Sequence, residues 1–588
     1  MAPQEVTHKE QLFKFGIGHT RGVKIEVLMS TAGQHIETDW VSAPRQIRGQ
    51  DQLGCQAPCE LTYSQLLPGI TNVTDRARYF SFYPWVTWSL DKLFSAVTED
   101  RYVELYRRAD CLYTLIAAQE SKTSGNVRQA EAMIGRLRLL PALDRLTSGT
   151  PLRLSDYATQ EESDERYFKN RMGGLGQYYV GSLAELGVCA KAPSGPWIKY
   201  TEEFGKVLAT SFDATLPSND FWAAVESDVI TIKDLVALKA FSPHLLIDGS
   251  EEQNLLLDMF FVRNRYSESV GSLKGLQRRH TLALILHLAD SLSASDEIWL
   301  SEWTFRPIVY SGAISSSAAW ELPSSLLETR KLWSIYERND LLSSACLIVF
   351  AASLRQLRRE ASDDFTHYES VEGFSEHYAA NPDFMAALET LSANTFGALV
   401  ENVTKEGPLL AHWKDPMHEF SLEDQLVADW YAQKKSSHDL IANAILLLAS
   451  LAARQTDFPT AYGNLLIQAD ELETYPINLV SFHKRAAGWA STPLDLVAKD
   501  LIAWCLNTHL TVALRKLWQT RTSSFHIRPA ENGLQVIGDI PPPTRTLPRI
   551  RQSLRILEDL GALEEHATDR GRLLLTPLGQ ALLEEALV

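Results

Sequence analysis

The densest group of candidate metal ligands lies in the stretch HWKDPMHEFSLED. Its histidines and carboxylates are His412, Asp415, His418, Glu419, Glu423 and Asp424. Imidazole and carboxylate groups bind the metal ions that activate water in hydrolytic enzymes. Neighbouring side chains on a helix point apart, however, and Pro416 interrupts regular helical spacing. The pattern therefore favours a polar loop that caps a helix, and we predict no metal site.

The cysteines are too dispersed along the chain to indicate a zinc site. They are Cys55, Cys59, Cys111, Cys189, Cys346 and Cys505. Only the first two are close in sequence, and neither a second pair nor a histidine cluster completes a set of four ligands. We predict reduced thiols, no cofactor and a cytoplasmic location.

Motifs that build a catalytic site locally are absent from the sequence. It has no Gly-x-x-x-x-Gly-Lys phosphate loop, no Gly-x-Ser-x-Gly nucleophile elbow and no His-Glu-x-x-His helix. Carboxylates and lysines from distant segments can still converge into one site. We therefore expect a non-enzymatic protein, and the alternative is a nuclease with a dispersed site in the helical body.

Charge is distributed unevenly along the chain. The formal net charge is −17, which argues against a surface that embraces nucleic acid everywhere. Residues 511–555 nevertheless carry eight basic side chains against Glu531 and Asp539. On an acidic protein, this local excess is the strongest indication of nucleic-acid contact in the sequence.

The elements that must position these basic residues lie in IRQSLRILEDLGALEEHATDRGRLLLTPLGQALL, residues 550–583. Apolar residues recur at helical spacing from Ile550 to Leu557. Gly561 then suits a left-handed helix end, and Thr576 suits the cap of another helix. Between them the pattern predicts a short hairpin.

This order of elements resembles the late part of the winged-helix superfamily, in which a helix is followed by a two-stranded wing and a final helix. The resemblance implies that the first helix enters the major groove of double-stranded DNA and that the wing tip reaches its backbone or minor groove. The nucleic-acid-binding residues that it implies are Arg545, Arg549, Arg551, Arg555, Arg570 and Arg572. A module that contacts only protein is the alternative.

A similar pattern occurs earlier, in residues 183–209. It also has a helix that ends in Leu-Gly, a span with turn residues, and a threonine and a glycine at Thr201 and Gly205. This copy has one more residue between threonine and glycine, and its first helix carries no basic residue. We expect a second winged-helix-like module near 170–210, with a structural or protein-binding role.

The stretch LLPGITNVTDRARYFSFYPWVTW, residues 66–88, combines arginines with dense aromatic residues. One interpretation is a partner-binding surface formed by Arg76, Arg78, Tyr79 and Tyr83. The alternative is a helix that anchors the core of the N-terminal domain. The density of aromatic residues favours the core helix.

The remaining sequence is dominated by long helical patterns. The longest apolar run, IANAILLLASLAA, is too short to span a bilayer and predicts a buried helix, so we expect no membrane contact. The expected fold class is mainly α, a large multi-domain helical body with a C-terminal winged helix. The predicted parts are a mostly helical domain at 1–150, the winged-helix-like module at 151–210, the helical body at 211–510, and a hairpin plus winged helix at 511–588.

The stretch LLPGITNVTDRARYFSFYPW and the general layout are together similar to large, uncharacterised helical proteins of bacterial anti-phage defence loci. The resemblance implies a subunit that works beside separate ATPase or nuclease components. We therefore expect a DNA-binding or assembly subunit with protein partners in a multi-subunit complex. A scaffold that binds only protein is a further alternative.

Overall fold

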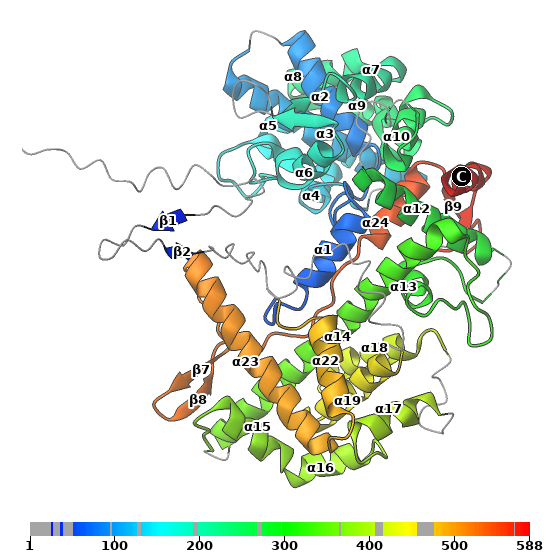
Figure 1. Cartoon of the computed structure of the whole chain (residues 1–588). Coiled ribbons are helices and arrows are strands. Elements are labelled where there is room, and N and C mark those ends of the chain that lie inside the picture. The colour runs from blue at the N-terminus through cyan, green and yellow to red at the C-terminus, as the bar shows by residue number, and fades with distance from the viewer. Residues whose placement is uncertain are drawn as a thin grey trace, which may run out of the picture.

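The helices of the protein gather into two lobes, one above the other in Figure 1. The computed structural model describes residues 25–27, 36–38, 51–94, 97–125, 131–191, 198–264, 266, 273–293, 295, 297–363, 366–405, 415–454, 475–569 and 571–588. Helices form most of this part of the chain, and its strands occur only as two-stranded pairs. The mainly α fold class is therefore confirmed.

The first lobe is built around the aromatic helix α2, Tyr79–Leu93, most of whose side chains are buried. The other helices of this lobe are α1 (Ala57–Leu66), α3 (Glu99–Ser124), α4 (Arg136–Thr147), α5 (Leu154–Ala158), α6 (Val180–Glu185), α7 (Gly205–Thr215), α8 (Ser218–Ser227), α9 (Ile232–Ala237), α10 (Glu251–Phe261), α12 (Leu273–Ser291) and α13 (Glu302–Ser311). Its strand pairs are β3 (Leu152–Arg153) with β6 (Val229–Ile230), and β4 (Cys189–Lys191) with β5 (Ile198–Tyr200). The aromatic stretch thus forms the centre of the lobe.

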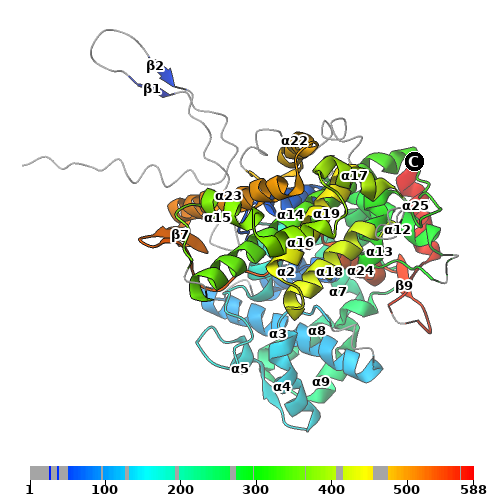
Figure 2. The same ribbon diagram turned by 90° about the horizontal axis from the view of Figure 1, so that it is seen from below.

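The second lobe is organised along α14, Ser324–Asp363, a helix of 40 residues. Seen from below in Figure 2, α14 lies beside α19 and α23, against which it packs. The elements of this lobe are α15 (Val371–Ala379), α16 (Pro382–Glu389), α17 (Phe396–Thr404), α18 (His418–Ala432), α19 (Ser437–Ala453), α22 (Leu479–Trp489), α23 (Leu494–Thr520), and the hairpin of β7 (Ile527–Ala530) and β8 (Gly533–Val536). A separate N-terminal pair joins β1 (Ile25–Val27) to β2 (Ile36–Thr38).

Two hydrophobic cores divide the chain differently from the predicted domains. The first core draws on residues 59–336 and again on residues 550–586. The second core draws mainly on residues 335–534. The predicted helical body at 211–510 is therefore split between the cores inside α14, and the predicted C-terminal part is split between its hairpin and its final helices.

Among the described helices, α14 is the one that is long and apolar enough to cross a membrane. Its most apolar window is 94% buried inside the molecule, however, and α14 packs against α19 and α23. Core helices of soluble proteins have the same length and composition. The position of α14 is thus that of a core helix.

The C-terminal unit consists of α24 (Ile550–Asp559), the hairpin of β9 (Leu563–Glu565) and β10 (Leu573–Leu575), and α25 (Pro577–Leu587). Gly561 has a positive φ of 75° after α24. The Thr576 hydroxyl donates to the Gly561 carbonyl at 2.7 Å and accepts from the Gly579 amide at 3.0 Å. A Cβ on Gly579 would lie 2.1 Å from the Ala562 carbonyl oxygen. The predicted helix end and cap are confirmed.

The earlier copy repeats these contacts around α6, β4, β5 and α7. The Thr201 hydroxyl donates to the Gly187 carbonyl at 2.6 Å and accepts from the Gly205 amide at 2.9 Å. A Cβ on Gly205 would lie 2.0 Å from the Val188 carbonyl oxygen. Because this copy has one more residue between threonine and glycine, α7 begins at Gly205 itself. The two sequence patterns therefore form the same local structure.

The segment of residues 69–77, which joins α1 to α2, lies between the two copies. In the earlier copy, Glu185 accepts the Gly69 amide at 2.9 Å. At the corresponding position of the C-terminal copy, Asp559 accepts the Ala77 amide at 3.0 Å. One acidic side chain of each copy thus binds one end of this segment.

Candidate nucleic-acid interface

The helix α24 is in contact with the rest of the protein on two faces. Ile550, Leu554 and Leu557 are buried in the first core, as their spacing predicts. A second stripe contains Arg549, Gln552, Arg555 and Asp559 and faces the chain between residues 64 and 77. The contacts of this stripe decide which arginines are accessible to a ligand.

Arg549 and Gln552 bind backbone groups of the facing segment. The Arg549 guanidinium donates to the Ile70 carbonyl at 2.6 Å and to the Ser64 hydroxyl at 2.9 Å. The Gln552 amide donates to the Asn72 carbonyl at 3.1 Å. Burial lowers the pKa of Arg549. This arginine therefore connects α24 to the end of α1 and is not free to meet a phosphate.

Arg555 and Arg551 differ in accessibility although both lie on α24. Arg555 forms ion pairs with Asp75 at 2.7 Å and with Glu131 at 2.8 Å, and its side chain is 12% exposed. The Arg551 side chain is 60% exposed and reaches only to 4.0 Å from Glu131. Of these two predicted DNA contacts, Arg551 is the one presented to solvent.

The predicted partner-binding arginines are buried in ion pairs. Arg76 donates to both carboxylate oxygens of Asp559, at 2.9 and 2.7 Å. Arg78 does the same with Glu252, at 3.0 and 2.9 Å. Burial raises the pKa of Asp559, against the opposing effect of Arg76. Both arginines join parts of the first lobe and do not form an external surface.

The predicted partner-binding tyrosines also lie inside the first lobe. Tyr79 and Tyr83 are fully buried. The Tyr79 hydroxyl accepts the Ile134 amide at 3.1 Å, and the Tyr83 hydroxyl donates to Asp110 at 3.1 Å. The partner-surface interpretation is therefore corrected: the alternative, an aromatic core helix, describes their positions.

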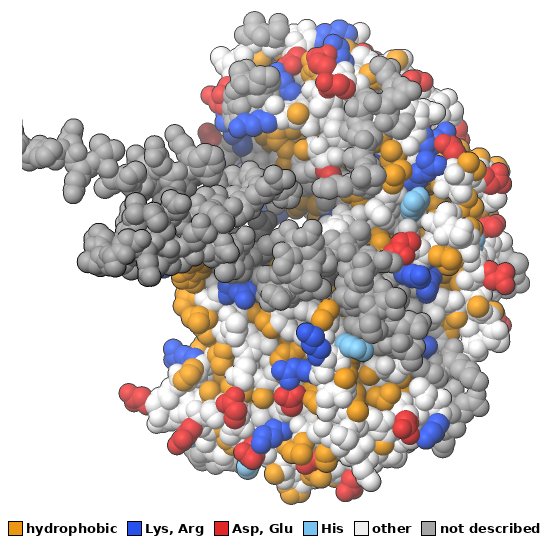
Figure 3. Space-filling view, in the orientation of Figure 1, with side chains coloured by type: hydrophobic (Ala, Val, Ile, Leu, Met, Phe, Trp, Pro, Cys, Tyr) orange, Lys and Arg blue, Asp and Glu red, His pale blue; other side chains and the backbone are white. Residues whose placement is uncertain are grey.

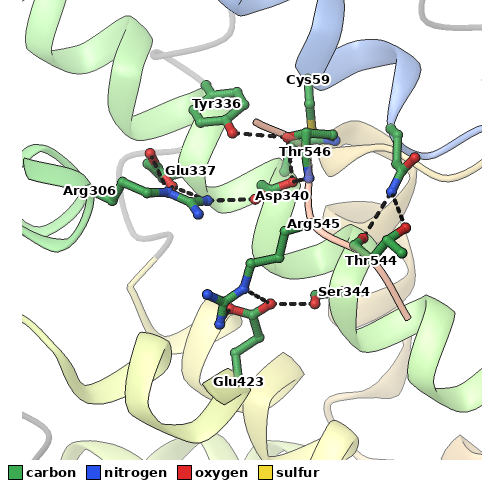
Figure 4. A network of polar contacts seen from close by, with 12 residues as sticks. Cys59, Arg306, Tyr336, Glu337, Asp340, Ser344, Glu423, Thr544, Arg545 and Thr546 are labelled. Atoms are coloured by element: carbon green, nitrogen blue, oxygen red, sulfur yellow. Dashed lines mark hydrogen bonds and ion pairs between the residues drawn. The ribbon is translucent and has the colours of Figure 1, made fainter. Parts of the chain in front are cut away.

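Arg545 precedes α24, and Figure 4 shows its side chain directed at Glu423. It pairs with Glu423 and Asp424 of α18. The next residue, Thr546, donates to Asp340 of α14 through both its amide, at 3.0 Å, and its hydroxyl, at 2.6 Å. The chain before α24 is therefore held by the second lobe, and Arg545 is occupied.

Of the hairpin arginines, the described one, Arg572, contributes little exposed charge. Arg572 donates to the Ser295 carbonyl at 2.9 Å, and its side chain is 13% exposed. Arg570 lies outside the described residues. The predicted set of DNA contacts is therefore corrected: Arg545, Arg549, Arg555 and Arg572 bind acceptors within the protein.

A pocket of about 640 Å³ opens beside the exposed part of α24, and we call it the α24 cleft. Its lining residues are Asn72, Asp75, Glu131, Ala132, Met133, Gly135, Arg136, Leu137, Arg138, Tyr167, Phe168, Tyr178, Glu302, Leu547, Arg551, Gln552 and Arg555. The lining thus contains four arginines and three carboxylates. Asp75 and Glu131 are engaged with Arg555.

Arg136 and Arg138 are the basic residues of the cleft that the sequence-based prediction missed. Neither has a side-chain partner among the described residues, and the Arg136 Nε atom is buried without a hydrogen bond. They occupy the first turn of α4, which contains no acidic residue. The helix dipole disfavours cations at the N-terminal end of a helix. Two arginines in the first turn of a helix are therefore the sequence feature that could have indicated these residues.

A second pocket, of about 720 Å³, lies near the other end of α24. Its lining includes the carboxylates of Asp248, Glu558, Glu564 and Glu565. Arg76 and Arg555 also line it, but both are held in ion pairs. The two pockets therefore differ in charge, and an anion is better accommodated in the α24 cleft.

The histidine and carboxylate group predicted to cap a helix lies at the start of α18. Glu419 accepts from the Tyr310 hydroxyl at 2.8 Å and pairs with Arg454. Burial raises the pKa of Glu419 and of Glu423. In the described ranges no three His, Cys, Asp or Glu side chains are placed to hold a metal ion, and His412 lies outside them. All six cysteines are buried and unpaired, as predicted.

One face of the molecule mixes the two signs of charge. On the face shown in Figure 3, the visible Lys and Arg side chains are interspersed with Asp and Glu. This distribution agrees with the negative net charge of the chain. Comparison of the chain with protein-family models, curated proteins and solved structures finds no match.

Proposed function

We propose that the chain is a non-enzymatic nucleic-acid-binding subunit of a multi-protein system and that it contacts nucleic acid at the α24 cleft. The observation that carries this proposal is the group of arginines at the cleft. Arg136 and Arg138 lack side-chain partners among the described residues, and Arg551 is exposed beside them.

The charge balance of the cleft supports an anionic ligand. Of the carboxylates, Asp75 and Glu131 already pair with Arg555. Glu302 lies in the first turn of α13, where the helix dipole stabilises its negative charge. The positive charges that remain are therefore available to phosphates, and arginine binds phosphate oxygens with two parallel N–H groups.

Charge reversal at the cleft tests this proposal. The triple variant Arg136→Glu, Arg138→Glu and Arg551→Glu should lower affinity for a fluorescent oligonucleotide at least about tenfold. The slope of log affinity against log salt should also become shallower by about 2, because fewer counterions are released. Arg528→Glu, on an exposed strand of the second lobe, is the matched control. Unchanged affinity and slope in the triple variant would rule out this site.

A protein-assembly role is favoured by a separate observation on α23. Leu514 and Trp518, one helical turn apart, are 61% and 68% exposed. Exposed large apolar side chains that share a helix face are typical of protein contact sites. If α23 binds a partner, Trp518→Glu should abolish co-purification of that partner while oligonucleotide binding is retained.

The resemblance to proteins of bacterial anti-phage defence loci supports a cytoplasmic subunit beside separate enzymes. The alternative, a nuclease with a dispersed active site, stays a prediction that a cleavage assay can test. Metal-dependent cleavage of nucleic acid by the purified chain, lost on replacement of a single pocket carboxylate, would establish that alternative.

A further inference from the structure

The form of nucleic acid that suits the α24 cleft follows from how α24 is packed. A helix that reads double-stranded DNA must present one long face to a major groove about 12 Å wide. On α24, the stripe that contains Arg549, Gln552 and Arg555 is already bound to residues 64–75 and to Glu131. Entry into a groove would require breaking these contacts. The structure is therefore unfavourable for duplex reading by α24.

The cleft also contains aromatic side chains beside its arginines. Phe168 and Tyr178 are half-buried in its lining, with their ring centroids 5.6 Å apart and their planes perpendicular. Leu137, 78% exposed, and Leu547, 59% exposed, add apolar surface at the same pocket. An unpaired base can stack on such surfaces, whereas the bases of a duplex have their faces covered by neighbouring pairs.

The size of the pocket agrees with a small, flat, charged ligand. At about 640 Å³ it lies within the range of pockets that enclose small molecules. Arg136 and Arg138 belong to the first turn of α4, and Arg551 belongs to α24, so the cations of the cleft come from two different helices. Aromatic side chains and cations that line one pocket are the combination by which proteins hold a nucleotide base and its phosphates together.

We propose that the α24 cleft binds an unpaired nucleotide of a single-stranded nucleic acid, with its base against Phe168 and Tyr178 and its phosphates at Arg136, Arg138 and Arg551. This inference rests on the proposed nucleic-acid-binding function. It narrows the ligand from nucleic acid in general to strands that expose unpaired bases.

The test compares three probes with the purified full chain. They are a short labelled oligothymidylate, a blunt duplex of the same length, and free thymidine monophosphate as competitor. We expect the single strand to bind at least about tenfold more tightly than the duplex. Thymidine monophosphate should compete only at much higher concentration, because it offers a single phosphate.

Substitutions of the two aromatic residues test where the base binds. Phe168→Leu and Tyr178→Leu keep apolar bulk but remove the stacking surface, and each should weaken single-strand binding about tenfold. Tyr431→Leu, at an exposed tyrosine of α18, is the matched control, and thermal unfolding confirms that each variant is folded.

The outcomes separate this inference from the function on which it rests. Equal binding of duplex and single strand, unaffected by the aromatic variants, would overturn the inference and leave the proposed function standing. Competition by thymidine monophosphate at concentrations equal to those of the oligonucleotide would also overturn it, in favour of a free nucleotide. No binding of any probe at low salt would overturn both.

Discussion

Arg76 and Asp559 form a two-pronged buried ion pair across 483 residues of sequence. Arg76 belongs to the segment before α2, and Asp559 is the last residue of α24. The same carboxylate accepts the Ala77 amide. The pair therefore joins the C-terminal unit to the centre of the first lobe.

Breaking this pair from one side should be strongly destabilising. Asp559→Leu removes the carboxylate that accepts two hydrogen bonds from the buried Arg76, and we expect a loss of about 3–5 kcal/mol in the free energy of unfolding. The double variant Arg76→Met with Asp559→Leu should recover much of it, because an apolar pair needs no neutralisation. Urea unfolding measures both.

The exposed pair of Lys206 and Glu202 provides the control for this experiment. Glu202→Leu should change the free energy of unfolding by less than about 1 kcal/mol. If Asp559→Leu lowers the free energy of unfolding as little as the control variant does, the buried pair is not needed for stability.

The two duplicated units should respond alike to the same substitution. In Gly205→Ala and in Gly579→Ala the new Cβ would lie 2.0 and 2.1 Å from a carbonyl oxygen, so backbone must move. We expect each variant to lose about 1–3 kcal/mol of stability. Gly488→Ala in α22, where nothing lies within 4 Å, should instead gain up to about 1 kcal/mol. Opposite effects at Gly205 and Gly579 would contradict a shared local structure.

Removing a carboxylate from the α24 cleft should increase its affinity for anions. Glu131 is 41% exposed and pairs with Arg555, and it approaches Arg551 to 4.0 Å. Glu131→Gln leaves Asp75 to neutralise Arg555, so oligonucleotide affinity should rise about two- to fivefold. Fluorescence anisotropy at low salt measures the gain. Glu161→Gln, on an exposed loop, should leave the affinity unchanged, and weaker binding by Glu131→Gln would contradict the site.

The free energy of unfolding should decrease as the pH falls, because the folded protein keeps the His509 side chain neutral. Burial lowers its pKa to about 4. Its Nε2 accepts the His526 amide at 2.9 Å, while Nδ1 lies 3.1 Å from the Gln52 carbonyl and donates to it. The stabilisation is complete above the ordinary histidine pKa of about 6.5 and is lost as the pH falls through the folded-state value.

The expected loss attributable to His509 is about 2 kcal/mol between about pH 7.5 and about pH 5. The stability difference between the native chain and His509→Gln should shrink by this amount over the same interval. Urea unfolding at the two pH values gives the comparison, with exposed His367→Gln as control. A difference that does not depend on pH would exclude His509 as the titrating group.

Local structure was largely predictable because its causes are local. The cap formed by Thr576, the left-handed turn at Gly561 and the hairpin that turns just before Gly533 depend on residues close to them in sequence. The repeated threonine and glycine likewise indicated a second copy before its contacts were known. These features follow from backbone geometry that few residue types satisfy.

The environment of the arginines was not predictable from the same pattern. The spacing of Arg551 and Arg555 is that of two solvent-facing cations, yet the acceptors of Arg555 are Asp75 and Glu131, more than 400 residues away. Nothing in a local window distinguishes an arginine paired by tertiary contact from a free one. The boundary between the two cores could not be predicted from the sequence either. It lies inside α14, which passes from one core to the other without a break in its helical pattern.

The composition of the first core determines the order in which the chain can fold during synthesis. That core requires residues 59–336 together with residues 550–586. The second core, mainly residues 335–534, is translated in between. The second core can therefore form while the first still lacks α24 and α25. Until these two helices emerge, the apolar surface that they cover is open to chaperones.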